Sequence, residues 1–379
     1  MGQSILITGG AGFIGSHLAD ELLRAGHRVR ALDNLAPQVH GDAASAGRRP
    51  DYLDPEVELV VGDVRDAAAV RRALEGVDAV YHFAAAVGVG QSMYEIAHYT
   101  DVNNMGTAVL LEAMLARQKS RPFSRLVVAS SMSLYGEGLC AGPDGRVVPP
   151  AERTREQLAA GDWEVRDADG RVLTPLPTPE TKAPSLASVY ALSKYDQERL
   201  CLIAGRAYGI PTAAMRFFNV YGTRQALSNP YTGVLAIFGS RLLNDRAPMI
   251  YEDGLQQRDF VSVYDVARAC RLALDAPAAD GETINVGSGQ KYTVRELAER
   301  LAAVMGKGYL APEVTGKYRV GDIRHCVADV TRARDLLGYT PQVDFDAGLR
   351  ELAEWLDGQT AVDRVDAASA ELAARGLTV

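Results

Sequence analysis

The first fifteen residues constrain the fold more than any other stretch of the chain. The segment from Ile5 to Thr8 is a short run of apolar and β-branched residues, typical of a buried parallel strand. Gly9, Gly12 and Gly15 follow, and residues 16–23 then have helical periodicity. The N–H groups at the start of such a helix, together with its dipole, attract a pyrophosphate. An ordinary strand-to-helix turn is the alternative, but the flanking strand and helix favour a dinucleotide site.

Each glycine has a separate reason to be present in this turn. Gly9 permits the tight turn, Gly12 lets the backbone approach the phosphates, and Gly15 lets the helix pack closely on the strand. A second expected strand, residues 27–32, ends in Asp33 and Asn34, about twenty residues beyond the last glycine. A carboxylate at this position accepts both ribose hydroxyls of an adenosine and repels a 2′-phosphate. The sequence therefore predicts NAD rather than NADP, with a simple loop aspartate as the alternative.

The next strands bring further candidate residues to the same edge of the sheet. A third strand, residues 57–61, leads into Asp63, which either hydrogen-bonds the adenine or caps the following helix. A fourth, residues 79–86, ends in small residues that let the backbone pass close to a cofactor, and we expect its His82 to be a packed side chain. Residues 94–117 read as one long helix that carries Asn103 and Asn104. A fifth strand, residues 126–130, runs into Ser131 and Ser133.

Strands alternate with helices throughout this half, which indicates a doubly wound parallel sheet of the Rossmann type, an α/β fold. Residues 137–184 interrupt the alternation with a segment rich in proline, glycine and charge, and we interpret them as an insertion at the rim of the sheet. We expect residues 1–222 to form the NAD-binding domain and residues 256–289 to return to it. Residues 223–255 and 290–379 should form a smaller α/β substrate-binding region, with residues 224–253 less regular.

Tyr190 and Lys194 open the helix that follows the insertion. They are four residues apart, so they share one helix face and can reach one ligand together. A tyrosine with a pKa of about 10 is a poor base at neutral pH, but a nearby ammonium and a positive nicotinamide ring favour the phenolate. On an isolated surface helix, a Tyr and a Lys at this spacing would not indicate a catalytic site. The hydroxyls of Ser131 and Ser133 at the end of the fifth strand favour a catalytic site.

The overall composition excludes several other functions. A net charge of −8 without a long Lys/Arg run argues against nucleic acid as a partner, and no apolar stretch is long enough to span a membrane. The four cysteines are scattered without paired spacing, which favours reduced thiols and a cytoplasmic protein. The first strand begins almost at once, which leaves no room for a signal peptide.

Three motifs together resemble the extended short-chain dehydrogenase/reductases, and more narrowly the NAD-dependent nucleotide-sugar epimerase/dehydratase family. They are the Gly9–Gly15 loop, the Tyr190-x-x-x-Lys194 pair and the segment Arg216 to Gly222. The similarity covers nearly the whole chain. Residues 224–233 and the tail after Trp355 resemble the dTDP-L-rhamnose 4-epimerase branch.

The resemblance implies a role for each candidate residue. Tyr190 is the catalytic base, Lys194 holds the nicotinamide ribose and lowers the tyrosine pKa, and the Ser131 hydroxyl bridges the sugar oxygen and Tyr190. Contacts to NAD are expected from Gly9, Gly12, Phe13, Ile14, Gly15, Asp33, Asn34, Asp63, Val64, Phe83, Ala84, Ala85, Asn103, Tyr190, Lys194 and Phe217. Contacts to the nucleoside-diphosphate sugar are expected from Ser131, Ser133, Tyr190, Asn219, Arg258 and Arg324. The two arginines should bind its phosphate groups.

Two departures from the family narrow the expected activity. Dehydratases of this family carry an Asp-Glu pair after the catalytic Thr, whereas this chain has Met132 and Ser133, so dehydration is not expected. Relatives in this branch often have paired cysteines in the insertion that resemble a zinc ribbon. Here Cys140 stands alone, with Asp167 and Asp169 near the place of a second pair, so we predict no metal.

The sequence thus predicts an isomerase that inverts C4 of a nucleotide sugar through a transient 4-keto intermediate with permanently bound NAD. The alternatives are a nucleotide-sugar dehydrogenase or 4-ketoreductase of the same family, and a non-catalytic NAD-binding scaffold. The nucleotide (dTDP, UDP or ADP) and the C6 substituent stay open. The helices 94–117 and 190–208 match those that pair in dimers of the family, so we expect a homodimer.

Overall fold

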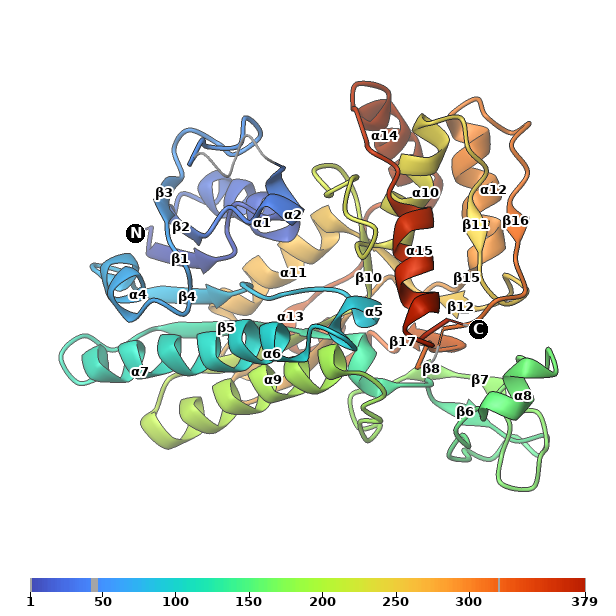
Figure 1. The fold of residues 1–379 in the computed structure, drawn as a ribbon. Coiled ribbons are helices and arrows are strands. Elements are labelled where there is room, and N and C mark those ends of the chain that lie inside the picture. The colour runs from blue at the N-terminus through green and yellow to red at the C-terminus, as the bar shows by residue number, and fades with distance from the viewer. Residues whose placement is uncertain (1, 42–46, 320, 379) are drawn as a thin grey trace.

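The computed structural model describes residues 2–41, 47–319 and 321–378. At its centre is a seven-stranded parallel sheet in the order β3-β2-β1-β4-β5-β9-β14 (Figure 1). Its strands are β1 (Ser4–Thr8), β2 (Arg28–Asp33), β3 (Glu58–Val61), β4 (Ala79–His82), β5 (Arg125–Ser131), β9 (Thr212–Phe217) and β14 (Thr283–Val286). This order is the doubly wound arrangement of the predicted Rossmann-type fold, so the predicted fold class is confirmed.

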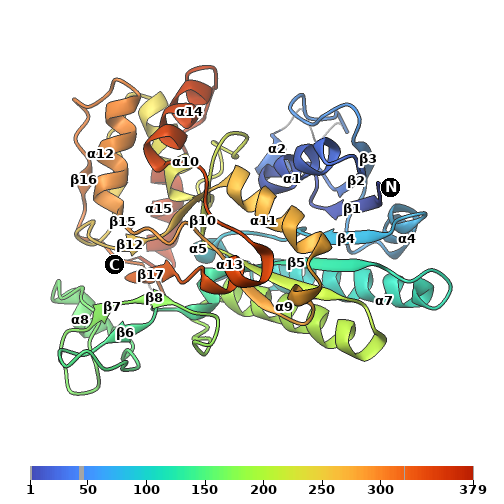
Figure 2. The ribbon, with the colours of Figure 1, turned by 180° about the vertical axis from the view of Figure 1, so that it is seen from behind.

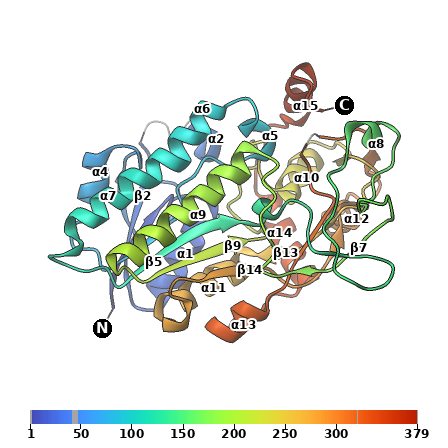
Figure 3. The same cartoon turned by 90° about the horizontal axis from the view of Figure 1, so that it is seen from below.

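Helices cover both faces of the sheet, as the view from behind (Figure 2) and the view from below (Figure 3) show. One face carries α4 (Ala67–Leu74), α7 (Gly106–Gln118) and α9 (Val189–Tyr208); the other carries α1 (Phe13–Arg24), α11 (Val263–Asp275) and α13 (Thr331–Leu337). Alternate residues of β1 pack into two apolar cores, one on each face of the sheet. Ile5 and Ile7 pack with Leu18 of α1, whereas Leu6 packs with Leu110 of α7, as the period-two pattern of a doubly covered strand requires.

The long helix predicted over residues 94–117 is correct in extent but not in type. The chain forms α5 (Val89–Ser92), α6 (Ile96–Tyr99), a π-helical stretch (Thr100–Met105) and then α7 without a break from α6 onward. The Asn103 side chain lies inside the π-helical stretch, where its amide accepts from Ala86 N (2.7 Å) and donates to Ser193 Oγ (2.9 Å). A local π-helical turn is a common way to aim one side chain at a functional site.

A second group of elements stands beside the carboxyl ends of the strands (Figure 1). Its apolar cluster joins α10 (Val234–Leu243), α12 (Val294–Val304) and α14 (Phe345–Asp357). The last helix, α15 (Val365–Ala374), runs alongside. The predicted irregularity of residues 224–253 is wrong for α10. The apolar run at its start, Val234 to Phe238, is the signal that sequence reading missed.

Short strands connect these parts. A four-stranded sheet has the order β15-β12-β17-β8, formed by β15 (Tyr292–Thr293), β12 (Gln257–Arg258), β17 (His325–Ala328) and β8 (Pro177–Thr178). Two-stranded pairs join β10 (Asn219–Tyr221) to β13 (Phe260–Ser262), β11 (Met249–Ile250) to β16 (Glu313–Val314), and β6 (Cys140–Ala141) to β7 (Thr174–Pro175). The other α-helices of the described residues are α2 (Pro37–His40) and α8 (Arg155–Ala159), and short 3-10 helices span Met132–Tyr135 and Pro277–Ala279. Strand β8 belongs to the insertion and is an edge strand of this four-stranded sheet, so the insertion is joined to the sheet that contains β12 and β17.

Candidate active site

One cavity of about 680 Å³ lies along the carboxyl edge of the central sheet. Its wall begins at the loop after β1 and β2, passes the ends of β4, β5 and β9, and continues onto α10 and α15. Ligands of doubly wound sheets bind at this edge. Most of the predicted site residues lie on this wall: Gly9, Gly12, Phe13, Ile14, Gly15, Asp33, Asn34, Asp63, Val64, Phe83, Ala84, Ala85, Ser131, Ser133, Tyr190, Lys194, Phe217, Asn219 and Arg258.

The glycine loop has the shape that a pyrophosphate requires. Gly9 has a φ of 71°, and a Cβ on Gly15 would collide with the Gly9 carbonyl oxygen, so neither position accepts a side chain. Helix α1 starts at Gly12 without a capping side chain. Its first N–H groups and the positive end of its dipole therefore face the cavity without a competing protein acceptor.

Asp33 and Asp63 lie at the end of the cavity beside this loop. The two oxygens of the buried Asp33 carboxylate accept from Ala11 N (3.1 Å) and Leu35 N (2.9 Å), which fixes the side chain at the strand end. Arg65 forks onto Asp63 and holds the pKa of that carboxyl at about 2, so it is charged. The alternative role of Asp63 as a helix cap is wrong, because Asp66 caps α4 through Ala68 N (2.8 Å) and Ala69 N (3.2 Å).

The middle of the cavity wall is held by neutral hydrogen bonds. The Thr8 hydroxyl accepts from Phe83 N and Ala84 N, both at 3.2 Å, which fixes the backbone after β4. The ring of Phe83 packs edge-on against Phe217, with centroids 5.7 Å apart. Asn103 is not on the cavity wall, contrary to the prediction. It supports the wall from behind through its bonds to the backbone of Ala86.

Three side chains meet where β5 ends and α9 begins. Ser188 caps α9 by accepting from Ala191 N (3.1 Å), and Tyr190 N donates to Ser92 Oγ (3.0 Å), so the start of the helix is fixed on both sides. The Ser131 hydroxyl accepts from Ser133 Oγ (2.9 Å), and Ser131 and Tyr190 line the same cavity. Lys194 lies one helical turn beyond Tyr190 and faces the same cavity.

The electrostatics of this group differ from the prediction in one respect. Burial raises the pKa of Tyr190, and the bond from Ser131 lowers it in part. Lys194 is not among the groups that lower the pKa of Tyr190, and its ammonium donates to Gln197 Oε1 at 2.7 Å. Burial lowers the pKa of Lys194 to about 8. A ligand that brings positive charge next to Tyr190 would favour the phenolate.

His82 is the packed side chain that the sequence predicted. It is fully buried, with Nδ1 2.8 Å from Thr8 Oγ1 and Nε2 2.8 Å from Thr107 Oγ1. Burial and the charge of Lys194 lower its pKa to about 3, so it stays neutral and links β4 to β1 and α7.

Polar groups on the opposite wall are available to a ligand. Asn219 Oδ1 and Gln256 Oε1 are buried without a hydrogen-bond partner, and both residues line the cavity. A buried acceptor without a partner costs free energy, so each is well placed to receive a donor from a bound molecule. Arg258 also lines the cavity, where its guanidinium donates to the carbonyls of Ile323 and Arg324.

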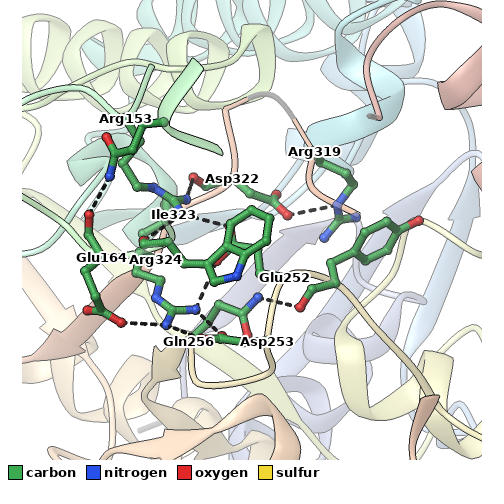
Figure 4. Close-up of polar contacts among 12 residues, drawn as sticks. Arg153, Glu164, Glu252, Asp253, Gln256, Arg319, Asp322, Ile323 and Arg324 are labelled. Carbon is green, nitrogen blue, oxygen red and sulfur yellow. Dashed lines mark hydrogen bonds and ion pairs between the residues drawn. The ribbon is translucent and has the colours of Figure 1, made fainter. Parts of the chain in front are cut away.

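The assignment of Arg324 to substrate phosphate requires correction. Its guanidinium is fully buried and paired with Glu164, Glu252 and Asp253, and it is not on the cavity wall. Arg319 lines the cavity in its place (Figure 4).

Arg319 donates from Nε to Asp322 Oδ2 at 2.9 Å, and its guanidinium lies 4.9 Å from the centre of the Tyr251 ring. The glycine at 321, with a φ of 83°, turns the chain between Arg319 and Arg324. This turn directs the two arginines to different places, and its glycine is the local signal in the sequence that could have indicated the difference.

Helix α15 forms a wall of the cavity; it lies in the region predicted to bind substrate, although no helix was predicted there. Val365, Ala368, Ser369 and Leu372 line it. A Cβ on Gly90 would lie 3.4 Å from the Leu372 side chain, so α15 packs directly against α5, whose Ser92 binds the backbone of Tyr190. The C-terminal helix therefore covers the catalytic end of the cavity.

The insertion has its own small core around Cys140, which packs with Val165 and Leu173. Asp167 and Asp169 pair with Arg171. Within the described residues, no group of three or more His, Cys, Asp or Glu side chains could hold a metal ion.

Comparisons with known proteins agree with this geometry. A family model described as GDP-mannose 4,6 dehydratase matches residues 6–142, and one described as NAD dependent epimerase/dehydratase family matches residues 170–287. A dTDP-L-rhamnose 4-epimerase from Burkholderia thailandensis is 37% identical over 94% of this chain and 95% of its own length. A putative UDP-glucose 4-epimerase from Methanocaldococcus jannaschii is 31% identical over 93% of this chain and 98% of its own.

Solved structures resemble the chain over nearly its whole length. A UDP-glucose 4-epimerase from Thermotoga maritima, solved with UDP-glucose, has a TM-score of 0.74 at 30% identity and covers 93% of this chain and 98% of its own. One from Thermus thermophilus, in complex with NAD, has a TM-score of 0.72 at 31% identity, covering 94% of this chain and 100% of its own. The chain belongs to the NAD-dependent epimerase/dehydratase family of the short-chain dehydrogenase/reductases. The predicted family and the NAD cofactor are confirmed.

Proposed function

We propose that this protein is a nucleotide-sugar 4-epimerase that works through a transient 4-keto sugar. The observation that carries the proposal is the meeting of Ser131, Tyr190 and Lys194 on the wall of the cavity that also contains the glycine loop. The loop fits NAD, since Gly9 and Gly15 leave no room for a side chain and α1 starts without a capping side chain. Bound NAD supplies reversible hydride transfer, and the protein positions the sugar and moves a proton.

Tyr190 takes the proton from the C4 hydroxyl of the sugar as that carbon is oxidised. Ser131, which lines the cavity beside Tyr190, orients the hydroxyl between the two side chains. Lys194, whose pKa of about 8 leaves it charged at neutral pH, binds the ribose next to the nicotinamide. On the return step Tyr190 gives the proton back to the C4 oxygen.

Arg258, Arg319 and Asn219 are the proposed contacts to the nucleoside diphosphate. Two guanidinium groups on one wall suit the four non-bridging oxygens of a diphosphate, and the unpaired Asn219 Oδ1 can accept from the ligand. The similarity to dTDP-L-rhamnose and UDP-glucose 4-epimerases makes a dTDP-L-rhamnose-like or UDP-linked sugar the first candidate substrate. A panel of dTDP-, UDP- and ADP-sugars, with products identified by chromatography, tests this. Conversion to the C4 epimer of at least one is expected, and no epimer from any would contradict the proposal.

A dehydrogenase or 4-ketoreductase of the same family is the main alternative, because it would use the same three side chains. A scaffold without turnover is the other, and the presence of Ser131, Tyr190 and Lys194 on one cavity wall argues against it. The absorbance of the purified protein with substrate separates the three. Continued NADH formation indicates a dehydrogenase, no sugar-dependent change indicates a scaffold, and epimer without net NADH indicates the proposed activity.

We also propose a homodimer formed through α9 and the helical segment 96–118. Apolar side chains on these helices face outward, with Ile96 53%, Met105 55%, Leu192 46% and Ile203 59% exposed. Such a row of exposed apolar residues is typical of an interface. Light scattering at micromolar concentration should give twice the chain mass, and a monomer mass would contradict the proposal.

We place the enzyme in the cytoplasm, in keeping with its four cysteines, all free and buried. No described helix has the length and apolar character needed to cross a membrane.

A further inference from the structure

A network of buried charges joins the insertion to the substrate wall of the cavity (Figure 4). Arg153 and Glu164 come from the insertion, Glu252 and Asp253 from the loop after β11, and Arg324 from the residue before β17. The chain positions it joins are far apart, since Arg324 and Glu164 are 160 residues from each other in sequence.

Arg153 connects three parts of the chain at once. Its side chain is 5% exposed and pairs with Glu252 at 2.8 Å and with Glu137 at 3.2 Å. The same guanidinium donates to the Asp322 carbonyl at 2.7 Å. Arg153 is not on the cavity wall, so it acts on a bound ligand only through these partners.

Arg324 forms the other half of the network. Its guanidinium donates to Asp253 at 2.6 Å and 2.9 Å, to Glu164 at 2.7 Å and to Glu252 at 3.0 Å. Its backbone N–H donates to Glu137, the carboxylate that also binds Arg153. Breaking a buried pair by removing one partner leaves a charge without compensation, which is strongly unfavourable. The network therefore holds a single arrangement.

Glu252, a member of this network, and Asp322, whose carbonyl accepts from Arg153, also line the cavity. Glu252 has a φ of 53°, an unfavourable backbone conformation for a glutamate, and its two arginine partners hold it there. The turn from Arg319 to Asp322 is closed by Asp322 N on Arg319 O at 3.2 Å and by the ion pair of their side chains. The bond from Arg153 to the Asp322 carbonyl thus fixes the base from which Arg319 reaches the cavity.

We propose that the insertion, residues 137–184, is a positioning element for the nucleotide-binding wall, and that Arg153 is its key positioning residue. The insertion holds the 319–323 turn and the strained Glu252 in place, so that Arg319 and Arg258 converge on the diphosphate. The insertion thus sets affinity for the substrate nucleotide while leaving NAD binding and the chemical step alone. This inference rests on the proposed nucleotide-sugar function.

The test compares the NAD-containing enzyme and its Arg153→Met variant in the binding of UDP and dTDP by calorimetry. The loss of a well-placed hydrogen bond to a charged group weakens binding by about tenfold or more, so we expect at least tenfold weaker binding of the nucleotide that the wild type prefers. KM for the sugar substrate should rise in parallel, with kcat and the NAD content per chain unchanged. Arg153→Lys, which keeps the charge but not the fork, should recover part of the affinity.

Arg166→Met is the matched control, because Arg166 belongs to the same insertion but pairs with Asp162 at the surface. It should bind nucleotide as the wild type does. If Arg153→Met does not fold, Glu164→Gln serves in its place, since it weakens one link to Arg324 at a side chain that is 40% exposed. Unchanged nucleotide affinity in a folded Arg153→Met or Glu164→Gln protein would overturn the inference. A wild type that binds neither nucleotide would instead overturn the proposed function.

Discussion

The two walls of the cavity are held in place by different kinds of bonds. On the cofactor side, Thr8 and Asn103 fix the backbone through neutral hydrogen bonds within the sheet and its first helices. On the substrate side, Arg153 and Arg324 fix loops from distant parts of the chain through buried ion pairs. The first wall is a product of the fold, and the second is added to it by the insertion and by the loops beyond the central sheet.

This difference predicts that cofactor retention and substrate affinity can be changed separately. Neutral bonds within the sheet are coupled to global unfolding, whereas a loop held by a few ion pairs can shift locally while the sheet stays folded. Variants in each wall should therefore have separate effects. The reacting side chains between the two walls come first.

Tyr190→Phe should have the largest effect. The variant removes the proton acceptor and keeps the ring, which packs near Tyr99 with centroids 6.5 Å apart. General-base losses are typically about 10²- to 10⁴-fold, so turnover should fall by that much while NAD stays bound. Ser131→Ala should lose less, because it removes an orienting bond and leaves the base. Steady-state kinetics with NAD content measured on the same samples checks both, and full activity in Tyr190→Phe would contradict the assigned role.

Arg324→Met should affect stability, in contrast to Arg319→Met. Removing the fully buried Arg324 takes one cation from Glu164, Glu252 and Asp253, which we expect to cost about 3 kcal/mol of unfolding free energy. Arg319 pairs with Asp322 at a side chain that is 37% exposed, so its loss should cost about 0.5 kcal/mol. Arg319→Met should instead weaken nucleotide binding. Urea unfolding measures the loss of stability, and calorimetry measures nucleotide binding. A larger loss of stability in Arg319→Met, with weaker nucleotide binding in Arg324→Met, would return Arg324 to the binding site.

The sequence predicted the cofactor wall well and the substrate wall poorly, for a physical reason. Gly9 follows β1 directly, and Asp33 and Ser131 are the last residues of β2 and β5, so local periodicity places them at one edge of a parallel sheet. Arg153 and Glu252 are 99 residues apart, and no local pattern brings them together. The prediction that Arg324 binds phosphate failed for the same reason. The local sequence does not show that three distant carboxylates surround this arginine.

Asp33→Ser tests the cofactor wall alone. The wild type should bind NAD far better than NADP, because the Asp33 carboxylate would lie against a 2′-phosphate. Removing this charge should narrow the preference by about tenfold, the scale of one like-charge contact near a surface. Nucleotide-sugar binding should not change. Competition between NAD and NADP for the cofactor-free protein measures the ratio, and equal affinity for both in the wild type would contradict the role of Asp33.

His17 should have little effect at neutral pH, but it should give a pH dependence of stability on the cofactor side. Burial and the charge of Arg224 lower the pKa of His17 from 6.5 to about 4. Between these pH values the unfolded chain binds a proton that the folded chain does not, so stability is lost as pH falls from 6.5 toward 4. The slope from this site is at most about 1.4 kcal/mol per pH unit. His17→Gln should flatten the profile of urea unfolding by that amount, and an unchanged slope would argue against a neutral buried His17.

The central claim is that C4 of the sugar is oxidised and reduced in place between the two walls. A nucleotide sugar carrying deuterium at C4, turned over in ordinary water, tests this most directly. The account predicts that the epimer keeps its deuterium at C4, because the hydride that leaves this carbon returns to it, with NAD unchanged at the end. Mass spectrometry and proton NMR of the product give the answer. Epimer formed with the deuterium lost to solvent would contradict transient oxidation at C4.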